Sequence, residues 1–400
     1  MNSIDKLTEE KWQDYQLEYN PFPPAASGVG TGEKLSIPKT WETKITDLLN
    51  LLREGKGPKA FPLIGRYGSG KTYLLKWLEQ RYAQQGILPY FFDNPGLQFY
   101  DLANTLMRKV GRYEFSKALW ELSKKSLYMG RPRLIELNFE EWLRSIASKP
   151  EREKATHDLQ QVYQNLGLTE DEEIAYKLAL IVTGTASKPY FNYRDFVAGG
   201  KESLVAEKAE APYFRALIRA LIKINNVNGM AFLLDEFEEV SSGRRISKRQ
   251  GHEYLATLRR LINLSETENL WIVTAMTEEG AKTTEEIEPG LWERFTEKGQ
   301  YRFVIEPLPV QEAESLLIWW LDGVRTKEAK KGSLYPFPDG TISKLKQRTV
   351  LYPRTLVRFG FFLLSEAMSI KEKAPFRGDF VKQVIDKMYP KSEETSGGSK

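Results

Sequence analysis

A glycine-rich segment near residue 65 constrains this chain more than any other feature. An apolar run at residues 60–64 leads into it, and an amphipathic segment at residues 73–85 follows it and stops at Gly86. The segment has the pattern Gly-x4-Gly-Lys-Thr and consists of Gly65, Arg66, Tyr67, Gly68, Ser69, Gly70, Lys71 and Thr72. Strand, glycine-rich turn and helix, in this order, form the context that a P-loop requires. The sequence therefore predicts a phosphate-binding loop in an α/β fold.

The residue types in this loop each have a physical reason. Gly65, Gly68 and Gly70 let backbone N–H groups curl around phosphate oxygens without clashes from a Cβ. The helix that follows points its positive N-terminal end at the same anion. Lys71 can reach the β- and γ-phosphates, and Thr72 can offer its hydroxyl to Mg²⁺. We therefore expect ATP and Mg²⁺ as cofactors; the alternative is a glycine turn that matches the pattern by chance.

A second motif follows the apolar run at residues 230–234, which has the character of a buried strand. The run ends in two adjacent acids, Asp235 and Glu236. Asp235 would hold Mg²⁺, directly or through water, and Glu236 would orient and deprotonate an attacking water. A strand that ends in surface acids is common by itself, but beside a P-loop the pair favours hydrolysis of the nucleotide.

Composition excludes several classes of protein. The chain has no cysteine, which excludes disulfides and thiolate metal sites, and its 2 histidines, His157 and His252, are too few for a histidine metal cluster. The formal net charge of +4 is compatible with nucleic acid but does not indicate it. The longest apolar runs, residues 316–321 and 359–364, are far too short to span a bilayer. We therefore expect a cytoplasmic protein without membrane contact.

The periodicity of apolar residues divides the rest of the chain. Strands are predicted at residues 60–64, 87–93, 230–234, 270–275 and 301–305. Helices are predicted at residues 39–53, 97–110, 254–264, 289–297 and 310–389. Residues 112–228 show helical periods and no clear strand, and we expect Thr169 to cap one of the helices, with acidic residues in its first turn.

This order of elements, together with the two motifs, resembles the AAA+ ATPases. Within them the chain is most similar to the origin-recognition-like branch, which includes initiator ATPases, transposition-regulator ATPases and the ATP-binding proteins of BREX-type phage-defence systems. The resemblance is carried by Asn20-Pro21-Phe22, by Gly65–Thr72 and by residues 216–239. The last stretch, in which a helix leads through Gly229 into the acidic strand, looks most like the phage-defence group.

The resemblance implies an α/β fold with an AAA+ P-loop αβα nucleotide-binding core, a parallel sheet, a large helical insertion and a C-terminal helical lid. The expected boundaries are 1–38 for an N-terminal arm, 39–111 and 229–306 for the two parts of the core, 112–228 for the insertion, 307–390 for the lid and 391–400 for a disordered tail.

The resemblance also implies catalytic roles for three residues besides Glu236. Thr277 stands where the family keeps a polar residue that senses the γ-phosphate, with Thr274 as the alternative, although β-propensity also explains a threonine there. Arg294 occupies the place of an arginine finger, which would reach the nucleotide of a neighbouring subunit; a surface salt bridge is the alternative. Arg354 resembles a sensor-2 arginine that touches phosphate in its own subunit, whereas Arg358 is expected to be solvated.

A basic segment follows the acidic strand and contains Arg244, Arg245, Lys248 and Arg249. In the fold that the resemblance implies, a loop at this place can face a central channel or a nucleic-acid groove, and a solvated charged loop is an equal alternative. The excess of Lys and Arg in residues 311–390 points weakly towards nucleic acid. Together with the resemblance, this predicts binding to duplex DNA that is tighter with ATP.

Two classes of function remain open. The first is an ATP hydrolase that remodels or moves along nucleic acid or a protein partner. The second is a slow nucleotide switch or scaffold that recruits protein partners. Such a switch could assemble a complex on DNA, or it could act without contacting DNA. Because an arginine finger acts only across an interface, an ATP-dependent homo-oligomer is expected, with other proteins of a phage-defence or transposition system as further partners.

Overall fold

The computed structural model describes residues 12–24, 37–53, 58–93, 95–96, 99–128, 136–188, 190–193, 196, 206–235, 248–297 and 300–390. The chain divides into two compact units. The first consists of Met1–Gly55, Ile64–Trp77 and Val304–Lys400, and the second consists of Lys56–Leu63 and Leu78–Phe303. The glycine-rich loop and the C-terminal helices therefore belong to the first unit, and most of the sheet belongs to the second.

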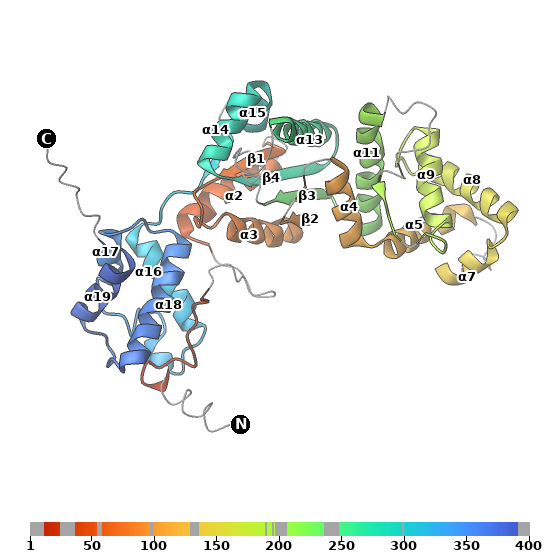
Figure 1. Ribbon diagram of the computed structural model, residues 1–400. Coiled ribbons are helices and arrows are strands. Elements are labelled where there is room, and N and C mark those ends of the chain that lie inside the picture. The colour runs from red at the N-terminus through yellow and green to blue at the C-terminus, as the bar shows by residue number, and fades with distance from the viewer. Residues whose placement is uncertain are drawn as a thin grey trace. The chain divides into compact units, whose positions relative to one another are not determined.

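Five strands form one sheet (Figure 1). They are β1 (Ala60–Ile64), β2 (Ile87–Phe92), β3 (Gly229–Leu234), β4 (Leu270–Met276) and β5 (Phe303–Val304), in the order β2-β3-β4-β1-β5. Strand β3 pairs in parallel with both β2 and β4, and every residue of β3 is buried, as is usual for a parallel sheet. The predicted α/β class and parallel sheet are confirmed, and the element order is the one that the resemblance to AAA+ ATPases implies.

Nine described helices follow one another in the second unit. They are α4 (Phe99–Val110), α5 (Arg112–Leu127), α7 (Phe139–Ser145), α8 (Lys149–Asn165), α9 (Glu172–Thr183), α11 (Ala206–Asn225), α13 (Lys248–Thr267), α14 (Glu278–Ile287) and α15 (Pro289–Thr296). Helix α11 packs against β3, α5 and α9. The ring of Phe214 on α11 lies 6.0 Å, between centroids, from Phe232 on β3. This helix therefore joins the helices of the predicted insertion to the sheet.

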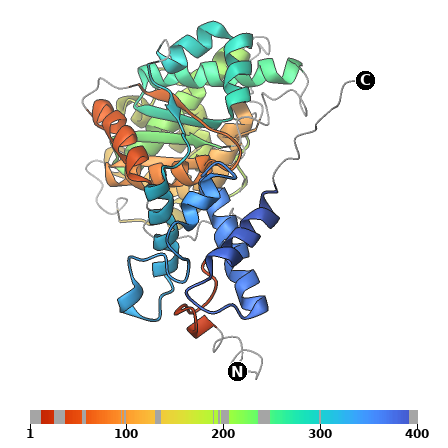
Figure 2. The same cartoon turned by 90° about the vertical axis from the view of Figure 1, so that its left-hand side faces the viewer.

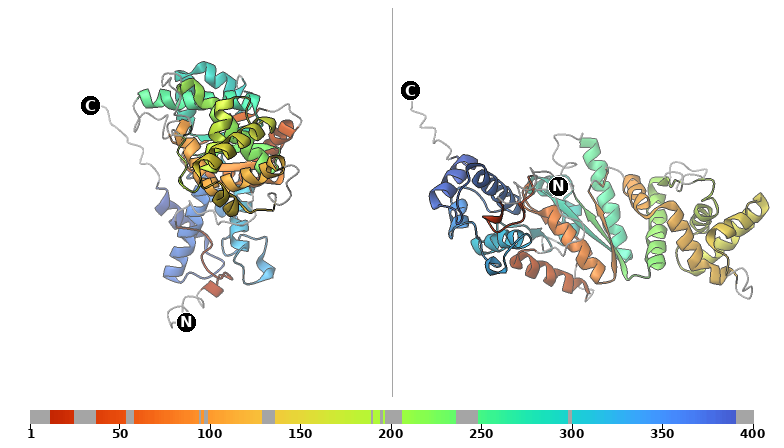
Figure 3. Two further views of the ribbon diagram at one scale, coloured as in Figure 1. Left: turned by 90° about the vertical axis from the view of Figure 1, so that its right-hand side faces the viewer. Right: turned by 90° about the horizontal axis from the view of Figure 1, so that it is seen from below.

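The helices between residues 112 and 183 have an apolar core of their own. Helices α5, α8 and α9 pack on one another (Figure 3). Trp120 on α5 and Trp142 on α7 are buried, with ring centroids 5.5 Å apart, and Phe139 lies 5.8 Å from Trp142. The indole Nε1 of Trp142 donates a hydrogen bond of 2.7 Å to the hydroxyl of Tyr128. The aromatic residues here pack as a core.

The prediction that Thr169 caps a helix is wrong by two residues. Asp171 is the N-cap of α9, and its side chain accepts from the backbone N–H of Ile174 at 3.0 Å. The hydroxyl of Thr169 instead accepts from the N–H of Asp171 at 3.2 Å. Because both side chains can cap, the position of the helix start decided between them, and a carboxylate is also favoured by the helix dipole.

The helices of the first unit are α2 (Lys39–Arg53), α16 (Val310–Asp322), α17 (Thr341–Lys346), α18 (Pro353–Ile370) and α19 (Gly378–Met388), with a short 3₁₀ turn η1 (Glu328–Lys330). Helix α3 (Lys71–Gln84) starts in this unit and continues into the other. Helices α16–α19 form a cluster (Figure 2) in which α18 packs on both α16 and α19. Leu356 and Leu363 on α18 are buried there.

The motif Asn20-Pro21-Phe22 packs on α18. The amide of Asn20 donates to the carbonyl oxygen of Phe361 and to the hydroxyl of Ser365, each at 3.3 Å. Phe22 is buried, and a Cβ added at Gly360 would lie 2.7 Å from its ring. A contact this close needs glycine at position 360. The motif is therefore a packing element of the helical cluster.

The basic segment starts a helix earlier than predicted. Lys248 and Arg249 lie in the first turn of α13 and not in a loop, because Lys, Arg and Gln all favour helices. Arg244 and Arg245 lie outside the described residues. Among the described residues, the helices lack the combination of length and hydropathy that a membrane-spanning segment needs.

Candidate functional site

The glycine-rich loop connects β1 to α3 and turns tightly. Gly68 and Gly70 have φ of +78° and +104°, which glycine adopts without strain. The N–H of Ser69 donates to the carbonyl of Arg66 at 3.1 Å, and the N–H of Leu74 donates to the carbonyl of Gly70 at 2.9 Å, which begins the helix. The loop therefore has the backbone that a phosphate cradle needs, directly before a helix N-terminus.

The side chain of Lys71 folds back onto the carbonyl groups of this loop. The residue is 7% exposed, and its Nζ donates to the carbonyl of Gly65 at 3.0 Å and to that of Arg66 at 3.3 Å. Ser69 is fully buried, and its Oγ has no hydrogen-bond partner among the described residues. A buried ammonium and an unpartnered buried hydroxyl in one turn suit a ligand rich in anionic oxygens.

Neighbouring helices leave little room for a side chain at Gly70. A Cβ at Gly70 would lie 3.3 Å from Cγ of Pro353 and 3.4 Å from Cη2 of Trp41. Trp41, on α2, is buried. Helices α2 and α18 thus press on the loop from outside, and neither contact was predicted from the sequence. Helical spacing identifies Trp41 only as an inward-facing residue and does not say what it contacts.

Arg354, the residue predicted to act as sensor 2, lies in the first turn of α18 and contacts the loop. Its backbone N–H donates to the carbonyl of Gly68 at 3.4 Å, and a Cβ at Gly68 would lie 2.8 Å from Cδ of Arg354. Its guanidinium carbon lies 4.3 Å from the centroid of the Tyr67 ring. Within the described residues its guanidinium has no hydrogen-bond acceptor. Arg358, one turn later, is exposed.

Asp235 follows β3 directly and is 5% exposed. Its N–H donates to the carbonyl of Phe92 at 2.8 Å, which extends the pairing of β2 and β3 by one residue. Glu236, the predicted general base, lies outside the described residues. The sheet order places β3 and β1 in one sheet with β4 between them, and both predicted motifs come directly after their strands.

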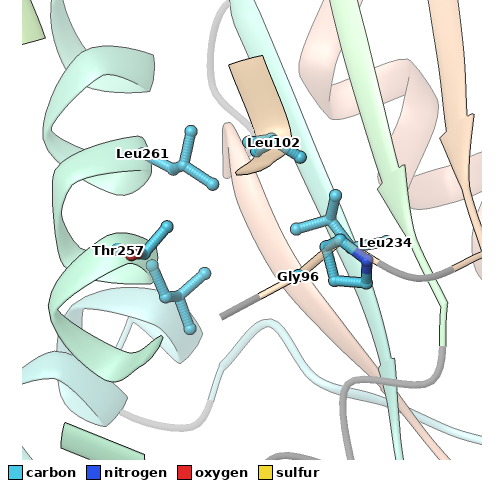
Figure 4. A pocket seen from close by; sticks show the side chains of 7 residues that line it. Gly96, Leu102, Leu234, Thr257 and Leu261 are labelled. Atoms are coloured by element: carbon cyan, nitrogen blue, oxygen red, sulfur yellow. The ribbon is translucent and has the colours of Figure 1, made fainter. Parts of the chain in front are cut away.

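A small pocket lies beside the end of β3 (Figure 4). Leu234 on the strand, Leu102 on α4 and Leu261 on α13 line it, and Thr257 is the polar side chain in the lining. This lining offers no cation for a phosphate group. The loop at residues 65–72 is therefore the better candidate for a nucleotide.

The two candidate γ-phosphate sensors differ in environment. Thr277 is the N-cap of α14, and its hydroxyl accepts from the N–H of Gly280 at 3.0 Å. Thr274 is fully buried on β4, and its hydroxyl has no partner among the described residues. A capping hydroxyl can still donate its own proton. Both residues therefore remain chemically able to contact a ligand oxygen.

Arg294 lies near the end of α15 and is partly exposed. Its Nη2 is 2.5 Å from Oε1 of Glu266 on α13, and the side chains are 44% and 56% exposed. Exposed pairs of this kind contribute little to stability. The arginine is thus accessible, but it would have to leave Glu266 to act on another subunit.

The residues present fit ATP and Mg²⁺. At Gly65, Gly68 and Gly70 an added Cβ would crowd neighbouring atoms in or beside the turn, so glycine keeps the backbone close-packed there, and Lys71 supplies a cation inside the turn. Thr72 is exposed, and a threonine hydroxyl and an aspartate carboxylate are oxygen ligands of the kind that Mg²⁺ prefers.

No protein-family model matches the chain, and comparison with curated proteins finds no relative. Among solved structures, the chain is similar to the ORC2 protein of Aeropyrum pernix in its ADPNP–ADP complexes. The TM-score is 0.42 and the sequence identity 11%, and the similarity covers 89% of this chain and 70% of the other.

Proposed function

We propose that this chain is an AAA+ ATPase that binds and hydrolyses ATP with Mg²⁺ in the cytoplasm. The observation that carries the proposal is the loop at residues 65–72, in which Lys71 lies inside the turn and Arg354 lies across it. Two fixed cations around a glycine-lined turn suit a polyphosphate, and the helix N-terminus adds to the attraction. The element order supports the AAA+ class.

The roles of the residues follow from their chemistry. Backbone N–H groups of residues 65–72 would bind phosphate oxygens, and Lys71 would exchange its two loop carbonyls for the β- and γ-phosphates. Thr72 and Asp235 would hold Mg²⁺, which when bound neutralises charge on the phosphates. Glu236 would take a proton from the attacking water. Arg354 would donate to the terminal phosphate in its own subunit.

The chain would act as an ATP-dependent homo-oligomer. Arg294 is exposed enough to reach a nucleotide held by a neighbour, once it leaves Glu266. The arginine would add charge stabilisation that a single subunit lacks. Thr277 or Thr274 would report the γ-phosphate from within the subunit.

Lys71→Ala tests the nucleotide site. Because the loop loses its internal cation, we expect affinity for a fluorescent ATP analogue to fall by about 10²-fold or more. The matched variant Glu236→Gln keeps ATP binding and should lower the hydrolysis rate by about 10²-fold or more, since an amide cannot take a proton. Unchanged ATP affinity in Lys71→Ala contradicts the proposal, whereas unchanged hydrolysis in Glu236→Gln contradicts only the choice of base.

Duplex DNA is the partner that we propose, within a phage-defence or transposition system. Arg244, Arg245, Lys248 and Arg249 support this by charge, because each neutralised phosphate releases counterions. Log affinity should then fall with log salt by about 0.9 per contact, and changing all four residues to alanine should flatten the slope. An unchanged slope, measured by fluorescence anisotropy with and without ATP, would sink the DNA proposal while leaving the ATPase proposal intact.

A slow switch or scaffold is the alternative within the same site. A motor should turn over ATP at roughly 1 to 100 per second, as phosphoryl-transfer enzymes do, and a switch much more slowly. Steady-state hydrolysis with and without DNA separates the two.

A further inference from the structure

Tyr67 is an aromatic residue in the middle of the glycine-rich loop and is 80% exposed. Neither loop closure nor core packing explains a large exposed ring at this point, because the turn is closed by the backbone of Arg66 and Ser69. The ring does have one specific neighbour: the guanidinium carbon of Arg354 lies 4.3 Å from its centroid. This distance is within the range of a cation–π contact.

A cation–π contact is not a hydrogen bond to the ring, so it leaves N–H donors of the guanidinium available. An arginine carries five such donors, more than one aromatic neighbour can engage. In the described part of the chain, no acceptor engages the donors of Arg354. The contact therefore orients the side chain without occupying the groups that would bind phosphate.

The remainder of the Arg354 side chain is held by the same loop. Its backbone N–H donates to the carbonyl of Gly68, and its Cδ lies 2.8 Å from the position that a Cβ of that glycine would take. The arginine is therefore restrained at its backbone, along its aliphatic part and at its charged end. Restraining a long side chain before binding lowers the conformational entropy that binding costs.

We propose that Tyr67 is a positioning residue that holds the Arg354 guanidinium ready for the terminal phosphate of ATP. The inference rests on the proposed nucleotide site and adds a residue through which the loop tunes its preference for ATP over ADP. Because Arg354 would contact the terminal phosphate, loss of its contact with Tyr67 weakens the binding of ATP and leaves the binding of ADP nearly unaffected.

The test is a double-mutant cycle on the full chain, with equilibrium binding of fluorescent ATP and ADP analogues in the presence of Mg²⁺. Tyr67→Leu should weaken ATP binding about 2- to 5-fold, the size of an exposed cation–π contact. Tyr67→Phe keeps the ring and should bind ATP like the parent. Arg354→Ala should weaken ATP binding about 10-fold or more, as expected for a hydrogen bond to a charged group. Tyr67→Leu in that background should then have no further effect.

Tyr190→Leu is the matched control, because Tyr190 is 86% exposed and belongs to the other unit. It should leave both affinities unchanged. The inference is overturned if Tyr67→Leu leaves ATP affinity unchanged or raises it, if it weakens ATP and ADP equally, or if it has the same effect with and without Arg354. A parent protein that binds no ATP, or Lys71→Ala that binds it normally, overturns the proposed function and this inference together.

Discussion

The glycine-rich loop and the helices between residues 112 and 183 differ in what their buried serine and threonine hydroxyls bond to. In and directly after these helices, hydroxyls pair with one another: the hydroxyl oxygens of Thr156 and Thr183 lie 3.0 Å apart, and Thr185, just past α9, donates to Ser116 at 2.7 Å. In the loop, the buried hydroxyl of Ser69 has no partner among the described residues, and glycines keep side chains out of the turn.

This difference indicates what each region does. Hydroxyls that bond one another inside a packed region add to the stability of that region. In the same helices, Trp120 Nε1 and Tyr163 Oη are buried without a partner among the described residues, so this gain comes from the serine and threonine hydroxyls. A region that keeps polar groups and space for a ligand gives up some of that stability for binding. Substitutions among the helices should therefore lower the free energy of unfolding, and substitutions in the loop should lower the affinity for ATP.

The largest expected effect is on the helical core. Trp142→Ala removes a buried indole beside Trp120 and should lower the free energy of unfolding by about 3–5 kcal/mol. Trp142→Phe retains a ring and should cost less. Denaturant unfolding followed by circular dichroism measures both. If Trp142→Ala remains folded but binds ATP tenfold more weakly, the helices do not serve stability alone, and the contrast with the loop is wrong.

A smaller effect is expected in the loop. Gly68→Ala must place a Cβ at φ +78° and 2.8 Å from Arg354 Cδ, which displaces the arginine. We expect ATP affinity to fall about tenfold, as for the loss of a hydrogen bond to a charged group. Gly332→Ala is the control, because φ is +74° there but no atom lies within 4 Å of the added Cβ. Titration with a fluorescent ATP analogue compares the two. Equal affinities in the two variants would show that the Arg354 contact is unimportant.

The smallest effect on stability is expected at Arg294. Arg294→Ala removes an exposed ion pair with Glu266 and should change the free energy of unfolding by less than about 1 kcal/mol, with ATP binding unaffected. Hydrolysis by the oligomer should nevertheless fall. Mixing this variant with Lys71→Ala, which still carries the arginine, should restore activity. If mixed oligomers form without recovery, action across the interface is ruled out.

Local patterns predicted most of the fold. The helix expected at residues 39–53 is α2, and the strand expected at 60–64 is β1. Helix α14 was missed, although Thr277 followed by Glu278 and Glu279 is an N-cap with an acidic first turn. Thr277 therefore has a capping role that its local sequence indicates, besides the sensor role that the resemblance implies. The strand predicted at residues 301–305 is shorter in the structure, where β5 comprises only Phe303–Val304, because pairing with neighbouring strands decides where a strand ends.

The sequence alone determined the loop at Gly65–Thr72, its strand and its helix, since glycine conformations, apolar runs and helix signals act over a few residues. Only the tertiary structure brought Arg354 onto Tyr67 and Gly68, and Trp41 and Pro353 against Gly70. These contacts join segments far apart in the chain, and no local preference specifies them. They form because α2 and α18 bury their apolar faces in one unit, and packing then decides which side chains meet at the loop.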